Sequence, residues 1–164
     1  MARDHRYIVD VEWIGNRGTG TSAYGSYDRD HVTTAPGKTA IEGSSDPAFR
    51  GDRTRWNPEE LLVASLSQCH MLWYLHLAAA ADIRVLQYRD AAEGVMTESS
   101  DGGGHFVAAR LKPSVVLAEG ADLALATALH MRAHEKCFIA RSVNFPVTCE
   151  PVCVIAPWPN PRAG

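Results

Sequence analysis

Hydrophobic and polar residues follow two periods along the chain, and these periods predict its secondary structure. Residues Tyr7–Trp13 alternate with a period of two, as a half-buried strand does. Helical periodicity predicts a long helix over residues 57–81 and a shorter one over Ala121–Glu135. Further strands are expected over residues 21–27, 31–34, 38–42, 84–91, 105–117 and 147–155, with one helical turn at 46–50. This order of strands, long helix, strands, helix and strand predicts an α+β fold.

The long helix has a strong start signal. Asn57 can cap the helix, Pro58 suits the first helical position, and Glu60 completes a capping-box pattern. The helix is apolar on nearly every side, which is typical of a buried core or interface helix. It also contains Ser65, Ser67, Gln68, His70 and His76 and lacks flanking basic clusters, so we do not expect it to span a membrane.

Composition limits the class of protein. With 164 residues, 46% of them apolar and 21% charged, the chain is expected to form one globular domain over residues 1–156, followed by a proline-rich tail at 157–164. A formal charge of −3 argues against a nucleic-acid partner, because there is no basic stripe to neutralise phosphates. The N-terminus lacks an apolar signal region, and four cysteines then indicate free thiols in a reducing, cytoplasmic compartment.

Two cysteines carry the most informative chemistry. Cys69 lies within the long helix, and Cys137 follows the second helix, 68 residues later. A thiol this far inside a helix gains little from the helix dipole, so a cation from elsewhere must stabilise the reactive thiolate. Cys137 is expected to have a lowered pKa, because it follows a helix and opens the turn 138–142.

Three sequence blocks resemble the OsmC/Ohr family of thiol peroxidases, which reduce organic hydroperoxides. The blocks are WIGNRGTG at 13–20, NPEELLVASLSQCHM at 57–71 and HEKCFIARSVNFPV at 134–147, in the family's order. The resemblance covers about residues 6–155. It implies an antiparallel sheet packed on a long central apolar helix plus a second helix, in an intertwined homodimer without cofactor or metal.

The resemblance also implies roles for single residues. Cys69 would be the peroxidatic thiol and Cys137 the resolving thiol, with Arg17 as the activating cation and Glu59 as the carboxylate that holds it. The partners implied are a small organic hydroperoxide and an external dithiol reductant of the lipoyl type.

Three departures from the family pattern leave alternatives open. His70 stands where the family usually has Phe, and Phe138 stands where Pro commonly follows the second cysteine. The irregular segment 43–56 is longer and more basic than usual, so Arg50 or Arg53 could replace Arg17 as the activating cation.

Helix geometry adds an expectation about assembly. Glu59 and Cys69 are ten residues apart, which is about 15 Å along one helix. An arginine cannot readily bridge that gap, so Glu59 is expected to reach Cys69 from the antiparallel helix of a second subunit. We therefore predict a homodimer with two sites at its interface.

Other functions remain possible at this stage. His130, His134 and Cys137 have a spacing that could bind zinc, with Cys69 as a fourth ligand. The chain could also be a non-catalytic redox sensor, or an oxidoreductase that acts on disulfides. Cys149 and Cys153 are expected to pack in the core on one face of a strand, and His70 is expected to be a packing residue.

Overall fold

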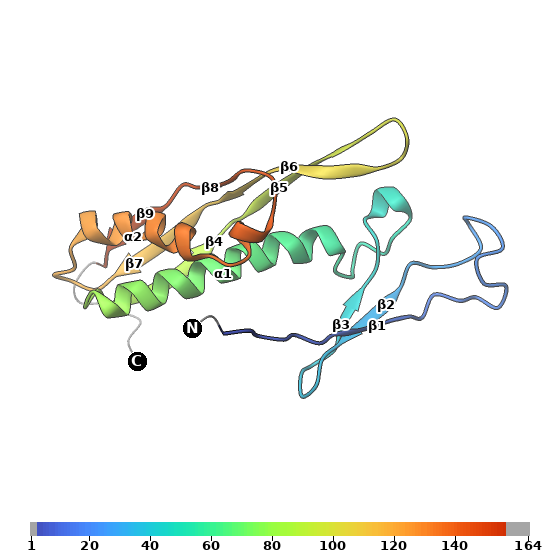
Figure 1. Ribbon diagram of the computed structural model, residues 1–164, viewed down its shortest axis with the longest axis horizontal. Helices are drawn as coiled ribbons and strands as arrows, with labels where there is room; N and C mark the ends of the chain where they lie inside the picture. The colour runs from blue at the N-terminus through green and yellow to red at the C-terminus, as the bar shows by residue number, and fades with distance from the viewer. Residues whose placement is uncertain (1–2, 157–164) are drawn as a thin grey trace. The chain divides into compact units, whose positions relative to one another are not determined.

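The computed structural model describes residues 3–156, so the predicted tail at 157–164 lies outside the described residues. The chain divides into two compact units, the first ending at Leu61 and the second beginning at Leu62. The prediction of an α+β fold is confirmed (Figure 1). The prediction of a single domain stays a prediction.

The first unit contains an antiparallel three-stranded sheet. Its strands are β1 (Asp10–Trp13), β2 (His31–Thr34) and β3 (Ile41–Gly43), in the order β1-β2-β3, followed by the 3-10 turn η1 (Pro47–Phe49). All four β1 residues are exposed, including the apolar ones. The predicted strand at 31–34 and helical turn at 46–50 are therefore confirmed.

The segment between β1 and β2 is an irregular loop, so the strand predicted at 21–27 is wrong. Side chains bind the loop backbone in place of a strand partner. The Asn16 side-chain oxygen accepts the amide hydrogens of Gly18 and Gly20, and the Ser26 hydroxyl bonds within the same loop. These local hydrogen bonds compete with strand pairing and satisfy the backbone without it.

The second unit contains two mixed sheets, in the orders β4-β7-β9 and β5-β6-β8. Each has an antiparallel pair, β4 with β7 or β5 with β6, and one parallel strand, β9 or β8. The strands are β4 (Val85–Asp90), β5 (Glu93–Glu98), β6 (Gly104–Leu111), β7 (Pro113–Leu117), β8 (Val147–Cys149) and β9 (Val152–Ile155).

The strand predicted at 84–91 is confirmed as β4, whereas the strands predicted at 105–117 and 147–155 are each interrupted once, at a proline. Pro113 opens β7 and Pro151 separates β8 from β9. Proline has no amide hydrogen to donate to a strand ladder, so it is confined to strand ends and bulges. Cys149 and Cys153 consequently lie on two strands in different sheets, which corrects the prediction that they share one strand.

Helices α1 (Pro58–Ala80) and α2 (Leu123–Lys136) lie along one face of these strands (Figure 1). One core cluster joins α1, α2 and the inward side chains of β7; its buried members are Tyr74, Ala78, Ile83, Val115, Leu117, Ala126, Leu129 and Ala133. A second cluster contains Leu66, Ala109 and Leu111. Within residues 3–156, no helix is long and apolar enough to cross a membrane.

Candidate active site

Cys69 lies near the middle of α1, beside the stripe that this helix buries. The stripe is Leu66, His70, Tyr74 and Ala78, spaced by four residues as one helix face requires. Cys69 is partly exposed, in contrast to the buried residues of this stripe.

Cys137 caps the C-terminus of α2 and is almost completely buried, with 1% of its surface exposed. The Ala140 amide lies 3.4 Å from its sulfur as a hydrogen-bond donor. Burial nevertheless raises the pKa of the Cys137 thiol to about 11, because loss of water penalises the thiolate more than the backbone amides of Ala140 and Ile139 help it. The expected lowering of this pKa is therefore wrong.

The two thiol side chains are neighbours. The Cys69 side chain acts on Cys137 both as a hydrogen-bond partner and through its charge, and both effects contribute to the raised pKa of Cys137. Two segments that are 68 residues apart in the sequence, one in α1 and one at the end of α2, therefore place these two side chains near each other. A thiol next to a thiol can form a disulfide after oxidation of either.

Arg17 lies in the loop that follows β1. Its Nε is 3.7 Å from the Asp28 carboxylate, and its terminal nitrogen donates to the Gly25 carbonyl oxygen. About half of its side chain is exposed. Arg17 and Glu59 belong to the first unit and the two thiols to the second, so their meeting remains a prediction.

Glu59 lies in the first turn of α1, where the reciprocal capping box is formed by its neighbours. Asn57 accepts the Glu60 amide hydrogen at 2.7 Å, and the Glu60 carboxylate accepts the Asn57 amide hydrogen at 3.2 Å. Glu59 is left out of this cap, and its Oε2 atom is buried without a hydrogen-bond partner. A buried carboxylate oxygen without a partner is costly, so this atom is suited to accept from a cation.

The other arginines that could activate Cys69 in place of Arg17 have different environments. Arg50 ends η1 in a left-handed conformation, with its guanidinium 5.9 Å from the Tyr24 ring centroid. Arg53 is exposed. Arg55, a third basic residue of the same segment, forms ion pairs with Asp30, Glu42 and Asp52 and is held within the first unit.

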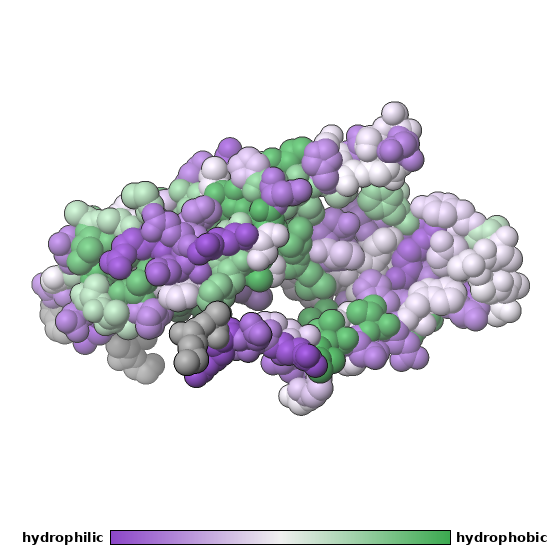
Figure 2. Space-filling view, viewed as in Figure 1, coloured by the Kyte–Doolittle hydropathy of each residue, from purple (hydrophilic) through white to green (hydrophobic). Residues whose placement is uncertain are grey.

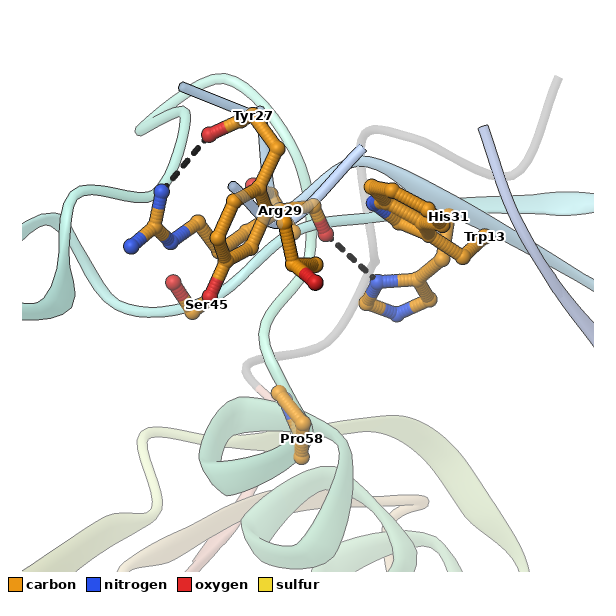
Figure 3. A pocket seen from close by; sticks show the side chains of 8 residues that line it. Trp13, Tyr27, Arg29, His31, Ser45 and Pro58 are labelled. Atoms are coloured by element: carbon orange, nitrogen blue, oxygen red, sulfur yellow. Dashed lines mark hydrogen bonds between the residues drawn. The ribbon is translucent and has the colours of Figure 1, made fainter. Parts of the chain in front are cut away.

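The first unit also contains a cavity of about 310 Å³ (Figure 3). The Arg29 guanidinium lies 4.3 and 4.2 Å from the ring centroids of Tyr24 and Tyr27, and the Arg29 carbonyl oxygen contacts the His31 ring. The lining residues are Trp13, Thr21, Tyr27, Arg29, His31, Ser44, Ser45 and Pro58. None of the predicted site residues lines this cavity.

The zinc-binding set that spacing offered as an alternative is not supported by the structure. Within the described part of the chain, the ligand atoms of His130, His134 and Cys137 do not gather; those of His70, His130 and Cys149 do, all within 4.8 Å of one another. Burial lowers the pKa of His70 to about 4 and that of His130 to about 3, so both rings are neutral. No local spacing signal identifies this set, because its members come from three elements.

Comparisons with known proteins support one family. The family model described as OsmC-like protein matches residues 51–151. An OsmC-like protein of unknown function from Vibrio cholerae is 30% identical, with a TM-score of 0.82, over 91% of this chain and 100% of that one.

Two more distant structures show the same fold. The organic hydroperoxide resistance protein OhrB of Bacillus subtilis is 20% identical, with a TM-score of 0.64 over 90% of this chain and 98% of its own. An organic hydroperoxide resistance protein from Elizabethkingia anophelis is 15% identical, with a TM-score of 0.68 over 95% and 100%. A comparison with curated protein sequences gave no match.

Proposed function

The chain belongs to the OsmC-like family, and from this premise we propose that it is a thiol peroxidase that reduces organic hydroperoxides to alcohols. Cys69 is the peroxidatic thiol and Cys137 the resolving thiol. The observation that carries this proposal is the proximity of the Cys69 side chain to Cys137, whose pKa it helps to raise. The relatives named for organic hydroperoxide resistance add support through their shared fold.

Exposure favours this assignment of the two roles. Cys69 is partly exposed, whereas Cys137 is buried and holds its proton at neutral pH because its pKa is raised to about 11. A peroxide from solution therefore meets Cys69 first, and the thiolate is the form that attacks.

The proposed reaction proceeds in three steps. The Cys69 thiolate attacks the distal oxygen of ROOH, the O–O bond breaks, and the alkoxide takes a proton and leaves as ROH, so Cys69 becomes a sulfenic acid. The Cys137 sulfur displaces the hydroxyl of that sulfenic acid, and the Cys137 proton leaves with it as water. The resulting disulfide is reduced by an external dithiol through a mixed disulfide.

Activation of Cys69 needs a cation, and we assign that role to Arg17 held by Glu59. The buried, unpartnered Oε2 atom of Glu59 supports the carboxylate's part, because a guanidinium donor would satisfy it. The exposed half of Arg17 leaves this side chain able to change partners from Asp28. Arg50 and Arg53 are the competitors that mutation must exclude.

The active form is proposed to be a homodimer, with Glu59 of one copy near Cys69 of the other. Large apolar side chains at the surface support a covering partner: among them Ile8, Val9, Val11 and Leu72 are each more than 60% exposed. Apolar surface is visible among the polar residues in Figure 2. Contiguous exposed apolar surface marks interaction sites in monomer structures.

An aromatic pair beside the thiols suggests the substrate's chemistry. Trp73 lies one helical turn after Cys69, and Phe138 follows Cys137 directly; their ring centroids are 5.7 Å apart, edge to face. Phe138 is 68% exposed and can contact a bound molecule. We therefore assign an apolar substituent to the hydroperoxide, in preference to hydrogen peroxide.

The test compares cumene hydroperoxide with hydrogen peroxide under excess dihydrolipoamide, in a cytoplasm-like reducing buffer. The proposal expects turnover with cumene hydroperoxide, slower turnover with hydrogen peroxide, and none in Cys69→Ser. Oxidation for a single equivalent without turnover would instead identify a redox sensor. Reduction of a disulfide substrate without peroxide consumption would identify a disulfide oxidoreductase.

A further inference from the structure

A second group of reactive side chains lies in the core of the second unit, apart from the two thiols described above. His70 from α1 and His130 from α2 face each other, with His70 Nε2 3.0 Å from His130 Nδ1. The Cys149 sulfur, at the end of β8, is 3.5 Å from His70 Nε2. His70 follows Cys69 in the sequence, but consecutive helix residues point about 100° apart. The two side chains therefore lie in different environments.

Core packing alone does not explain why these polar side chains are buried together. His70 and His130 are 0% and 1% exposed, yet they share one hydrogen bond between them. The His70 Nδ1 atom is buried with no partner, and their other polar contacts are to thiols, which are weak hydrogen-bonding groups. Two large polar rings placed in an apolar core with so few partners are unfavourable unless something else binds them.

We propose that His70, His130 and Cys149 bind one Zn²⁺ ion in each chain. Two imidazole nitrogens and one thiolate are ligands that zinc prefers, and three protein ligands leave a fourth tetrahedral position for water. On binding, the Cys149 thiol gives up its proton and the thiolate sulfur donates an electron pair to the metal.

The distances fit this ion. For tetrahedral zinc, standard bond lengths place two nitrogen ligands about 3.3 Å apart, and a nitrogen and a sulfur about 3.6 Å apart. The corresponding separations here are 3.0 Å and 3.5 Å. All three donor atoms lie within 4.8 Å of one another. The two imidazole nitrogens now face each other, so zinc binding requires rotation of the rings to direct both nitrogens toward the ion.

The surroundings also suit a divalent cation. The Cys153 sulfur lies 3.7 Å from His130 Nε2, so it can orient the ring through the nitrogen that does not face His70. The Asp90 charge acts on both His70 and Cys149, and its carboxylate is held by Ser67 at 2.6 Å and by the Lys112 amide at 2.7 Å. One thiolate and one nearby carboxylate together balance the two positive charges of zinc.

Zinc at this place would join α1, α2 and β8, three elements that are far apart in the sequence. Because the ion binds the folded chain, it should raise the unfolding temperature as its concentration rises. This site does not depend on the peroxidase proposal, since its ligands exclude Cys69 and Cys137.

The direct test is titration of metal-free, reduced full-length protein with Co²⁺, which reports a bound thiolate by a sulfur-to-cobalt charge-transfer band. The Cys69→Ser/Cys137→Ser double variant removes the other thiol pair and serves as the background. We expect a band that saturates at one Co²⁺ per chain and is abolished by excess Zn²⁺, together with a zinc-dependent rise in melting temperature. Absence of the band in this background would overturn the proposal.

Two single changes in that background locate the site. Cys149→Ser should abolish the charge-transfer band, whereas Cys153→Ser should retain it, because Cys153 is a neighbour of His130 and not a ligand. Circular dichroism checks that both variants are folded. A band that survives Cys149→Ser, or one lost with Cys153→Ser alone, would contradict the assignment of ligands.

Discussion

At the scale of single residues, the two thiols differ because their surroundings differ. Cys137 is buried and its pKa is raised to about 11, while Cys69 is partly exposed on α1. We expect iodoacetamide to modify Cys69 first at pH 7 and Cys137 to become reactive only as the pH approaches 11. Peptide mass spectrometry over a pH series measures both. Equal modification of Cys137 at pH 7 would contradict its buried, protonated state.

The raised pKa of Cys137 also makes the stability of the folded chain depend on pH. The pKa of Cys137 is about 11 in the folded chain, against 9.0 for an ordinary thiol. Above pH 9 the unfolded chain loses a proton that the folded chain keeps. The contribution of this thiol to stability is therefore constant below pH 9 and declines as the pH rises toward 11.

Replacement of Arg17 tests the activating cation. Arg17→Met should slow oxidation of Cys69 by cumene hydroperoxide by at least about tenfold, because loss of one charge-assisted contact is worth about 1.5–3 kcal/mol. Stopped-flow measurement of the rate, with Arg53→Met as the matched surface control, checks this. If Arg17→Met keeps the wild-type rate and the control does not, the role belongs to the basic segment before α1.

The sequence predicts the thiol pair but not the second cluster, for a physical reason. Cys69 and Cys137 lie in blocks with a recognisable local pattern. His70, His130 and Cys149 come together only through packing of α1, α2 and β8. Burial is also a property of the folded chain, so the direction of the Cys137 pKa shift could not be read from its place after a helix.

At the scale of elements, α1 begins where its cap is formed. The Asn57 side chain accepts the Glu60 amide hydrogen, and the Glu60 carboxylate accepts the Asn57 amide hydrogen. Asn57→Ala should lower the free energy of unfolding by about 1 kcal/mol, whereas Asn57→Asp should keep most of it because Asp remains a good cap. Urea denaturation measures both variants. Equal losses in the two would show that burial of Asn57, and not its cap, is what matters.

Local signals explain which elements were predicted well. Both helices were predicted well, because caps and periodicity act within a few residues. The strands over residues 105–117 and 147–155 were predicted too long, although Pro113 and Pro151 mark the breaks in the sequence itself. The strand predicted at 21–27 is absent because this segment bonds locally: the Ser26 hydroxyl accepts from the Ala23 amide and donates to the Ala23 carbonyl oxygen, a conformation that alternation does not reveal.

At the scale of the whole molecule, the proposed dimer can be tested by complementation. One subunit carries Cys69→Ser and the other carries Glu59→Gln. If Glu59 serves the partner's Cys69, each mixed dimer has one intact site and should show about half of the wild-type peroxidase activity per dimer. If both residues act within one chain, every site is damaged and the mixture stays as inactive as the parent variants.

The most direct measurement is peptide mass spectrometry of the reduced protein after one equivalent of cumene hydroperoxide. The account predicts a Cys69–Cys137 disulfide in the wild-type chain and a sulfenic acid at Cys69 in Cys137→Ser. A disulfide or oxidised sulfur at Cys149 or Cys153, with Cys69 unchanged, would contradict it.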